Sequence, residues 1–397
     1  MDRFINIKIQ LAWQSKSQME VLRGIQEYLM LRPRWAIHIC CYPDELDVRD
    51  QDALILSVPL PDERVAMPEF HGPVVSIMAN DSAAVCIERQ NTMIGEMAAD
   101  SFIARGFGRL AFVPVRAAGT QWRYSAERQD SFVRAAQRRG VSVLLSPGGV
   151  ESWTPGSSIC EWVKQLPRPC GIFCATDLAA MEVLAMCRYH GIAVPEELAV
   201  LGCDNDEYWC ETARPPLSSV SIPWRRVGYT AAEWVDRLLM GRKPPRSRYV
   251  LIEPTGVVVR QSTDVVAISQ PELARALQYT RDHACEGITV KELLDAVGIE
   301  RRRLYALFTN HLGRTPHEEI RRIQIEKAKE LLVNTDLPQR EICRAVGLSM
   351  VYFNINFRNV VGKSPGAYRA EHRLRDVKAL PTHKAKRSVK YRRGRKQ

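Results

Sequence analysis

The 397-residue sequence lacks an apolar run of about 18 residues, the length that a membrane-spanning helix needs. Its first residues also lack the charged segment and long apolar stretch of a secretion signal. The 11 cysteines lie in apolar runs, without the paired spacings of a disulfide framework or a zinc site. We therefore expect a cytoplasmic protein of two or three domains with reduced cysteines in its cores.

A catalytic constellation is also missing from the sequence. There is no glycine-rich phosphate loop, no metal-spaced cluster of His and Cys, and no nucleophile beside a base in sequence. We expect no enzyme, no metal and no cofactor. A transport-type binding protein is disfavoured as well, because it would need the missing secretion signal.

Positive charge is concentrated at one end of the chain. From Gln270 onward there are 27 Lys and Arg against 14 Asp and Glu, a net charge of +13, whereas the first 269 residues hold 29 and 31. A basic part joined to a near-neutral part indicates a polyanion-binding module with a partner domain. Residues 384–396 hold eight Lys and Arg and no acid, so we expect 377–397 to be a disordered tail. It would add non-specific phosphate contacts or be only a solvated extension.

The first 260 or so residues alternate short apolar runs with amphipathic stretches, which predicts an α/β fold with parallel strands and many crossovers. Strands are expected at 5–10, 36–41, 53–57, 74–77, 110–114, 142–145, 171–175 and 199–203. Helices are expected at 17–30, 92–105, 126–139, 160–165, 177–190 and 225–240. The polar, proline-containing stretch that follows predicts a linker, so we expect domains at 1–263 and 272–376 joined by 264–271.

The basic part contains one helical unit twice. Each copy has a short amphipathic helix, a glycine turn and a second helix, over 289–312 and over 339–361. Capping-box spacings at Thr289 and Thr315 mark two helix starts. The joining helix, 316–334, would span about 28 Å, comparable with the roughly 34 Å between successive major-groove faces. This pattern predicts two helix-turn-helix units reading one DNA face, and a helical bundle with a solvated basic surface is the alternative.

Helical geometry separates an inward from an outward face in each second helix. In the first, Leu304, Leu307, Phe308 and either His311 or Leu312 form the inward stripe. Its candidate DNA-contacting residues are Arg301, Arg302, Arg303, Tyr305, Ala306 and Thr309. In the second, Phe353 and Phe357 point inward with Val360 or Val361, and the outward candidates are Val351, Asn354, Ile355 and Arg358. Because arginine can bind guanine bidentately, we expect the first unit to contribute more sequence discrimination than the second.

A signature runs through the second unit and its lead-in: Ala328, Leu331, Leu332, Thr335, Ile342, Ala345, Gly347, Phe353, Phe357, Pro365, Tyr368 and Arg369. On these residues the chain resembles the C-terminal DNA-binding domain of the AraC family of bacterial transcription regulators. It departs from the family at Ala306 and Ile355, where members usually have a basic residue. The segment 348–352 is also one residue short.

The N-terminal part matches another family at Gly95, Ala98, Gly106–Val113, Glu127, Arg128, Phe132, Ala175–Asp177, Val200–Asn205 and Pro216–Val220. On these residues it resembles the sugar-binding core of LacI-type repressors, which is similar to periplasmic sugar-binding proteins. The resemblance implies a two-lobed, periplasmic-binding-protein-like receiver in which Arg128 and Asp204 clamp sugar hydroxyls. The alternatives are a surface helix charge for Arg128 and a turn-capping carboxylate for Asp204.

Further ligand candidates lie near these positions. Trp122 and Trp13 would cover the apolar face of a sugar ring, unless they are core residues. Asn205 continues the loop after Asp204. Asp177 follows a strand and begins a helix, so we expect it to cap that helix, with a ligand or hinge role as the alternative.

Together these features resemble the xylose-responsive activators of the AraC family. The resemblance implies a homodimer that binds a double-stranded DNA operator, answers to a xylose-like monosaccharide and acts on RNA polymerase. The alternative is a ligand-independent or non-sugar-responsive DNA-binding repressor or architectural protein.

Overall fold

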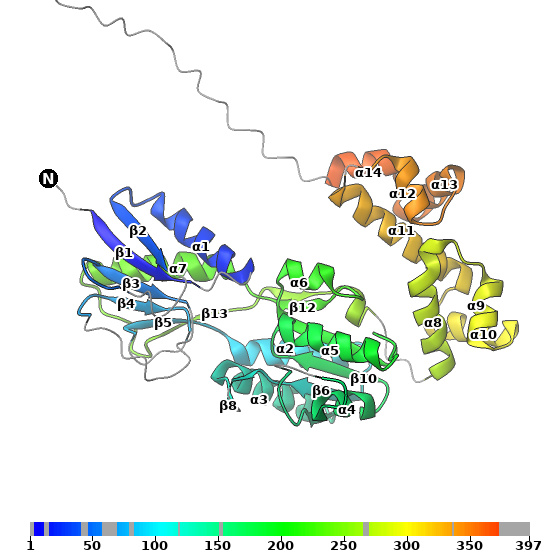
Figure 1. Cartoon of the computed structure of the whole chain (residues 1–397), viewed down its shortest axis with the longest axis horizontal. Coiled ribbons are helices and arrows are strands. Elements are labelled where there is room, and N and C mark those ends of the chain that lie inside the picture. Colours follow the sequence, from blue (N-terminus) through cyan, green and yellow to red (C-terminus); the bar gives the residue numbers. More distant parts are fainter. Residues whose placement is uncertain are drawn as a thin grey trace, which may run out of the picture. The chain divides into compact units, whose positions relative to one another are not determined.

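The computed structural model describes residues 4–11, 16–40, 47–57, 70–78, 83–117, 120–150, 154–264, 270–335 and 337–372 (Figure 1). Its contacts divide the chain into two units, Met1–Ala274 and Arg275–Gln397. Residues 265–269 of the expected linker and the expected tail, 377–397, lie outside the described residues. None of the described helices is long and apolar enough to cross a membrane.

The first unit has two six-stranded sheets. All neighbours in the first sheet are parallel, in the order β13-β5-β4-β3-β1-β2, with bounds β1 Ile5–Gln10, β2 Trp35–Cys40, β3 Ala53–Leu56, β4 Val74–Ser76, β5 Val85–Arg89 and β13 Tyr249–Ile252. The second has the order β14-β12-β11-β10-β6-β9, with bounds β6 Arg109–Val113, β9 Ser142–Leu145, β10 Cys170–Cys174, β11 Leu198–Asp204, β12 Ser218–Ser221 and β14 Gly256–Val258. Only β14 runs antiparallel to its neighbour in this second sheet. A short antiparallel pair, β7 Arg116–Ala117 and β8 Thr120–Gln121, completes the strands of the described residues.

Helices cover these sheets and define two lobes. The first lobe is the first sheet with α1 Lys16–Leu29 and α7 Trp224–Leu239. These two helices approach closely at glycines, since a Cβ atom at Gly24 would lie 1.9 Å from the Arg225 carbonyl oxygen. The second lobe is the second sheet with α2 Asn91–Ile103 and α3 Arg123–Arg138 on one face and α4 Ser158–Gln165 and α5 Asp177–Tyr189 on the other. The short α6 Glu207–Thr212 also belongs to the second lobe.

The chain passes between the lobes three times. It crosses at 89–91 from β5 to α2, at 221–224 from β12 to α7, and at 252–256 from β13 to β14. It then leaves the second lobe through a short 3-10 turn, Gln261–Thr263, whose hydroxyl groups are buried. Ser262 Oγ donates to the Val200 carbonyl at 2.6 Å and accepts from the Ser218 amide at 2.8 Å, and Thr263 Oγ1 donates to Ser218 Oγ at 2.7 Å.

The second unit is helical, and its elements confirm the doubled helix-turn-helix prediction. Helices α9 Val290–Val297 and α10 Arg301–Leu312 form the first helix-turn-helix unit, and α12 Gln339–Ala345 and α13 Met350–Val361 form the second. The joining helix, α11, spans Pro316–Asn334 as predicted. Around these lie α8 Pro271–His283, the 3-10 turn Ala284–Glu286 and α14 Pro365–His372.

Both expected capping boxes are formed. Thr289 Oγ1 accepts from the Glu292 amide at 3.2 Å, while Glu292 Oε2 accepts from the Thr289 amide at 2.7 Å. Thr315 and Glu318 repeat the arrangement at 3.3 and 2.7 Å. Each box satisfies donor groups that the first turn of a helix otherwise leaves without partners.

The second helices of the two units, α10 and α13, are called the reading helices below. Their inward faces are as predicted, and the structure decides between His311 and Leu312 and between Val360 and Val361. Leu304 and Phe308 are fully buried, and Leu312 is half-buried while His311 is exposed. In α13, Phe353 and Phe357 are fully buried, and Val361 is the partly buried neighbour while Val360 is half-exposed.

Candidate ligand cleft and DNA-reading surface

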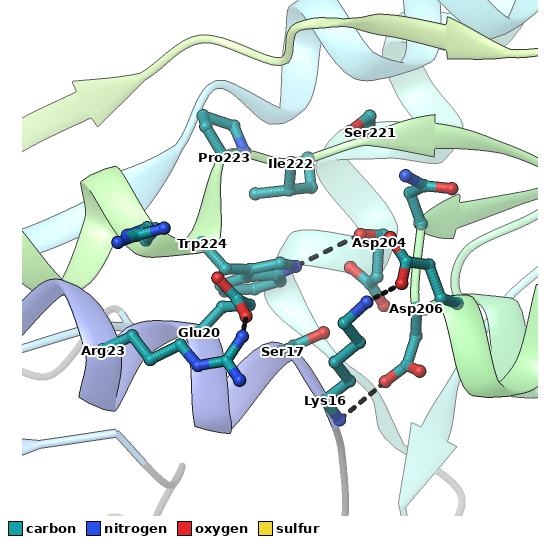
Figure 2. Close-up of a pocket in the computed structure, with 13 residues that line it drawn as sticks. Lys16, Ser17, Glu20, Arg23, Asp204, Asp206, Ser221, Ile222, Pro223 and Trp224 are labelled. Atoms are coloured by element: carbon teal, nitrogen blue, oxygen red, sulfur yellow. Dashed lines mark hydrogen bonds and ion pairs between the residues drawn. The ribbon is translucent and has the colours of Figure 1, made fainter. Parts of the chain in front are cut away.

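A cavity of about 380 Å³ lies where the lobes meet (Figure 2). Its walls are the start of α1 in the first lobe, the loop 204–207 of the second lobe, and the crossing at 221–225. Two of these segments follow the carboxyl ends of parallel strands, where loops of α/β folds bind ligands. Lys16 also joins the lobes here, because its amide donates to Asp206 Oδ2 at 2.9 Å and its ammonium group pairs with Glu207.

Asp204 ends β11 and lines this cavity. Burial raises the pKa of its carboxyl group to about 7, against the opposing charge of Arg128. The Trp224 indole N–H donates to the Asp204 carbonyl oxygen at 3.3 Å, and the backbone has φ 121, a region that non-glycine residues rarely adopt. Asp206, and not Asp204, caps the next helix by accepting from the Tyr208 amide at 3.1 Å. A carboxyl group whose pKa is about 7 is partly protonated at neutral pH, so it can both accept hydrogen bonds from a polyol and donate them to it.

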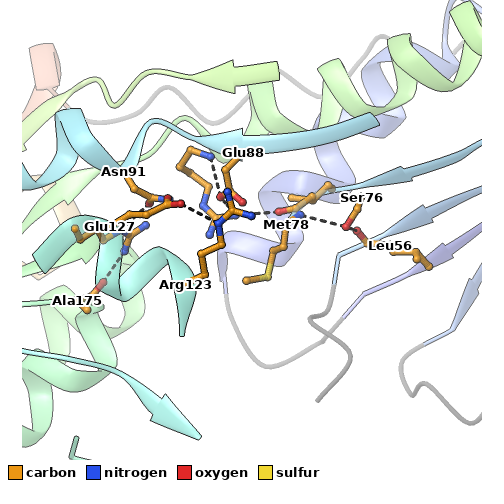
Figure 3. A network of polar contacts seen from close by, with 11 residues as sticks. Leu56, Ser76, Met78, Glu88, Asn91, Arg123, Glu127 and Ala175 are labelled. Carbon is orange, nitrogen blue, oxygen red and sulfur yellow. Dashed lines mark hydrogen bonds and ion pairs between the residues drawn. The ribbon is translucent and has the colours of Figure 1, made fainter. Parts of the chain in front are cut away.

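Arg128 is buried on the inner side of α3, with 1% of its surface exposed, so it is not a surface helix charge. Its Nε donates to Asn91 Oδ1 at 3.0 Å and its Nη1 donates to the Ala175 carbonyl at 2.5 Å. The guanidinium also lies over the Tyr124 ring, 5.1 Å from the centroid. Figure 3 shows its two partners, Asn91 and Ala175, within this network of polar contacts. Its charge acts on the Asp204 carboxyl group, so the fold brings these two predicted residues together.

The expectation that Asp177 caps α5 is wrong. Thr176 is the cap, accepting from the Ala179 amide at 3.2 Å. Asp177 instead points inward, and its oxygens accept from the Asp206 amide at 2.8 Å and from Ser219 Oγ at 2.5 Å. Burial raises the pKa of this carboxyl group to about 6. Asp177 thus holds the loop that carries Asp204 but does not line the described cavity.

The other ligand candidates differ in position. Asn205 lines the cavity, donates from its amide to Ser219 Oγ at 2.9 Å, and has a buried Oδ1 without a partner among the described residues. Trp122 precedes α3 and stacks on Tyr124 at 6.4 Å between ring centroids, outside the lining of this cavity. Trp13 lies outside the described residues.

Arg89 is a buried residue that the sequence did not reveal, and it lies beside Trp224, which lines the cavity. It ends β5, is 4% exposed, and lies between the rings of Tyr124 and Trp224, at 5.7 and 5.5 Å. Its Nη1 donates to the Ile77 carbonyl at 2.9 Å and pairs with Glu88, while its buried Nε has no acceptor within the described part of the chain. A buried donor without a partner is costly, so this group is available to a ligand. The signal was the charged pair at a strand end, but β5 itself was not predicted.

The outward candidates of the reading helices are exposed as predicted. In α10 these are Arg301, Arg302, Arg303, Ala306 and Thr309, while Tyr305 is half-buried and lies 5.5 Å below the Arg301 guanidinium. In α13, Val351 and Ile355 are 67% and 51% exposed, so the outward face of this helix is largely apolar. Asn354 differs, because its Nδ2 donates to the Met350 carbonyl of its own helix at 2.9 Å.

Comparison with known proteins supports the domain type of each unit. The first matches the family model of a periplasmic binding protein-like domain over residues 99–263, and the second matches a helix-turn-helix domain over residues 293–385. The class of protein is therefore a DNA-binding transcription regulator with a ligand receiver of this type.

Relatives narrow this class. The xylose operon regulatory protein of Escherichia coli is 36% identical over 271 residues, 67% of this chain and 68% of that protein. The Haemophilus influenzae protein of the same description is 34% identical over 288 residues, 71% and 74% of the two chains. The structure of a xylose-binding transcription activator matches with a TM-score of 0.80 and 29% identity, covering 93% of this chain and 98% of that one. The chain belongs to the family of xylose operon regulatory proteins, which are transcription regulators and not enzymes.

Proposed function

We propose that this regulator activates a sugar-utilisation operon in response to a xylose-like monosaccharide bound between its lobes. The observation that carries the proposal is Asp204, which lines the inter-lobe cavity with a pKa near 7 and feels the charge of the buried Arg128. Asn205 and Arg89 add an acceptor and a donor without partners among the described residues. Such groups favour a ligand rich in hydroxyls, because each hydroxyl both donates and accepts.

The proposed switch is closure of the lobes. A sugar that contacts both lobes binds their closed arrangement more tightly than the open one, and only this difference can shift the equilibrium. The contacts of Lys16 with Asp206 and Glu207 support the proposal, because they already connect the lobes at the edge of the cavity.

On DNA, we propose a cytoplasmic homodimer whose reading helices bind operator half-sites near a promoter and act on RNA polymerase. Arg302 and Tyr305 of α10 would discriminate bases, and Arg301, Arg303 and Thr309 would support them. Val351 and Ile355 would press against thymine methyl groups, and Arg358 would bind phosphate. Asn354 would have to release its bond to Met350 before it could read adenine.

A thermal-shift screen with pentoses and hexoses tests the effector, since a ligand of the folded state raises its stability. We expect one monosaccharide to raise the melting temperature and to change operator binding in a footprint. Asp204→Ala should abolish both responses and keep basal DNA binding. Glu211→Ala, an exposed carboxylate on α6 outside the cavity lining, is the matched control. If no sugar changes operator affinity or the footprint, the switch is refuted.

The competing function is a DNA-binding repressor or architectural protein that does not respond to sugar. Steep salt dependence with little sequence preference would favour it. Sequence-specific binding lost on Arg302→Ala would count against it.

A further inference from the structure

The DNA-binding unit contains a second cavity, of about 470 Å³, between the turn that leads into the first helix-turn-helix unit, the joining helix α11 and the second helix-turn-helix unit. Its walls are the turn at 287–288, the first half of α11, the turn at 347–349 and the start of α13. The two turns touch beside it. A Cβ atom at Gly347 would lie 2.6 Å from the Gly287 nitrogen and 2.7 Å from the Cys285 carbonyl oxygen. The cavity thus lies beside the contact between the turn that precedes the first unit and the turn of the second unit.

Charge at this cavity is of one sign. Arg321 and His317 line it and are joined by a 3.2 Å contact between Nη2 and Nδ1, and none of the lining residues is an Asp or Glu. The nearest carboxylates in sequence have other partners. Glu286 contacts His283 at 2.9 Å, and Glu318 accepts from the Thr315 amide. The charges of Arg321 and His317 also act on the Glu318 carboxylate outside the lining, so an anion inside the cavity would meet a cation and no acid among the lining residues.

Asn356 supplies a second, independent sign of a ligand. This side chain lines the cavity, is 7% exposed, and makes no hydrogen bond to any described residue. Its neighbour Gln324, equally buried, donates to the Ala284 carbonyl at 2.9 Å. The amide atoms of Asn356 remain accessible from the cavity, so its nitrogen can donate to a group bound there. Ser349 and Tyr352, at the start of α13, complete the polar lining.

We propose that this cavity binds a phosphate group of the DNA backbone between the two major grooves that α10 and α13 enter. Two helices in successive major grooves straddle the minor groove and the two backbones that border it, so the segment between α10 and α13 faces these backbones. Ser349 and Tyr352 lie at the N-terminal end of α13, the end that enters a groove. Such a contact fixes the position of both reading helices along the DNA and does not distinguish one base sequence from another. The proposal rests on operator binding by both units.

The test uses the full chain and an operator selected from random-sequence DNA. Arg321→Ala should weaken binding to all DNA sequences alike. It should also make the negative slope of log affinity against log salt concentration shallower by about 0.9, the value for one phosphate contact. Lys329→Ala, on the same helix and paired with Glu326 at 2.9 Å, is the matched control and should leave the slope unchanged. Base preferences should stay the same in both variants.

A methylphosphonate scan locates the phosphate. Neutralising one phosphate between the base pairs read by α10 and those read by α13 should weaken operator binding by the wild type. The same change should weaken operator binding by Arg321→Ala and Asn356→Ala clearly less. If both variants lose as much as the wild type at every phosphate, the cavity binds no backbone phosphate. Arg321→Ala carries the test if Asn356→Ala fails to fold.

Two further results would overturn the proposal. Inorganic phosphate that raises the melting temperature, with no single methylphosphonate position mattering, would assign the cavity to a free phosphate compound. If the variants lose the same operator affinity on neutralised DNA as on native DNA, the lining residues stabilise the fold and do not bind a phosphate. Either result leaves operator recognition and the sugar response intact, so the proposed function is tested separately.

Discussion

Replacing Asp204 with Asn should stabilise the receiver at neutral and alkaline pH in the absence of sugar. In the folded chain, burial holds the pKa of this carboxyl group at about 7, compared with an ordinary value of 3.8. The folded state therefore keeps a proton that the unfolded state releases. Stability falls as pH rises between these two values, and the loss is complete above about pH 7. Asn has no charge to bury and escapes the loss.

The size of the effect follows from the shift. About three pKa units correspond to about 4 kcal/mol at 1.36 kcal/mol per unit. Because Asp204 borders a cavity that water can enter, we expect about half of this, ~2 kcal/mol, or roughly 4 to 6 °C in melting temperature. At pH 5 the gain should be roughly a third of that at pH 8, since most of the titration lies above pH 5.

Melting curves from pH 5 to pH 8 measure this difference. Asn also tolerates the positive φ of this position better than Asp, which adds a gain independent of pH. The pH-dependent part therefore isolates the buried charge. Glu211→Gln controls for removal of one exposed negative charge from the adjoining α6. A gain that is equal at pH 5 and pH 8 would refute the argument that Asp204 is a desolvated acid.

Three further changes test other parts of the chain. Gly347→Ala forces alanine into φ +67 against backbone atoms and should weaken stability and DNA binding by well over 1 kcal/mol, whereas Gly313→Ala, at φ +66 in open space, should cost only the ~1 kcal/mol of its backbone conformation. Thr315→Ala removes the cap of α11 and should lower the free energy of unfolding by about 1 kcal/mol in urea. Arg302→Ala should relax base preference by roughly 1 to 3 kcal/mol in a binding assay with substituted operators, while Arg358→Ala should weaken all sequences alike.

The helical unit could be predicted closely because local signals define it. Capping boxes depend on residues three apart, and the stripe of Leu304, Leu307 and Phe308 follows from helical period alone. The strands predicted in the receiver also exist, because their apolar runs are continuous. The strands that were not predicted, β5, β7, β8, β12, β13 and β14, are two to five residues long, and all but β14 include charged or hydroxyl residues.

Site residues were harder to predict because burial comes from tertiary structure. Arg128 looks like an ordinary helix charge until α3 packs it against Asn91 and Ala175. Asp177 has the local pattern of a cap, but its partners, Asp206 and Ser219, come from strands and loops about 30 and 40 residues away. Asn356 occupies a flank of α13 that neither helical stripe includes, so only the joint between the units reveals it.

The buried hydroxyl groups at the end of the receiver have a consequence for how a signal could leave it. Ser218 binds Ser262 and Thr263 at the exit, and its neighbour Ser219 binds both Asp177 and the Asn205 amide in the cleft loop. The loop that would feel the sugar and the last anchored residues before the DNA-binding unit are thus two ends of one short polar chain. Because adjacent serines of β12 hold both, we expect a displacement of the cleft loop to move the exit turn Gln261–Thr263 as well.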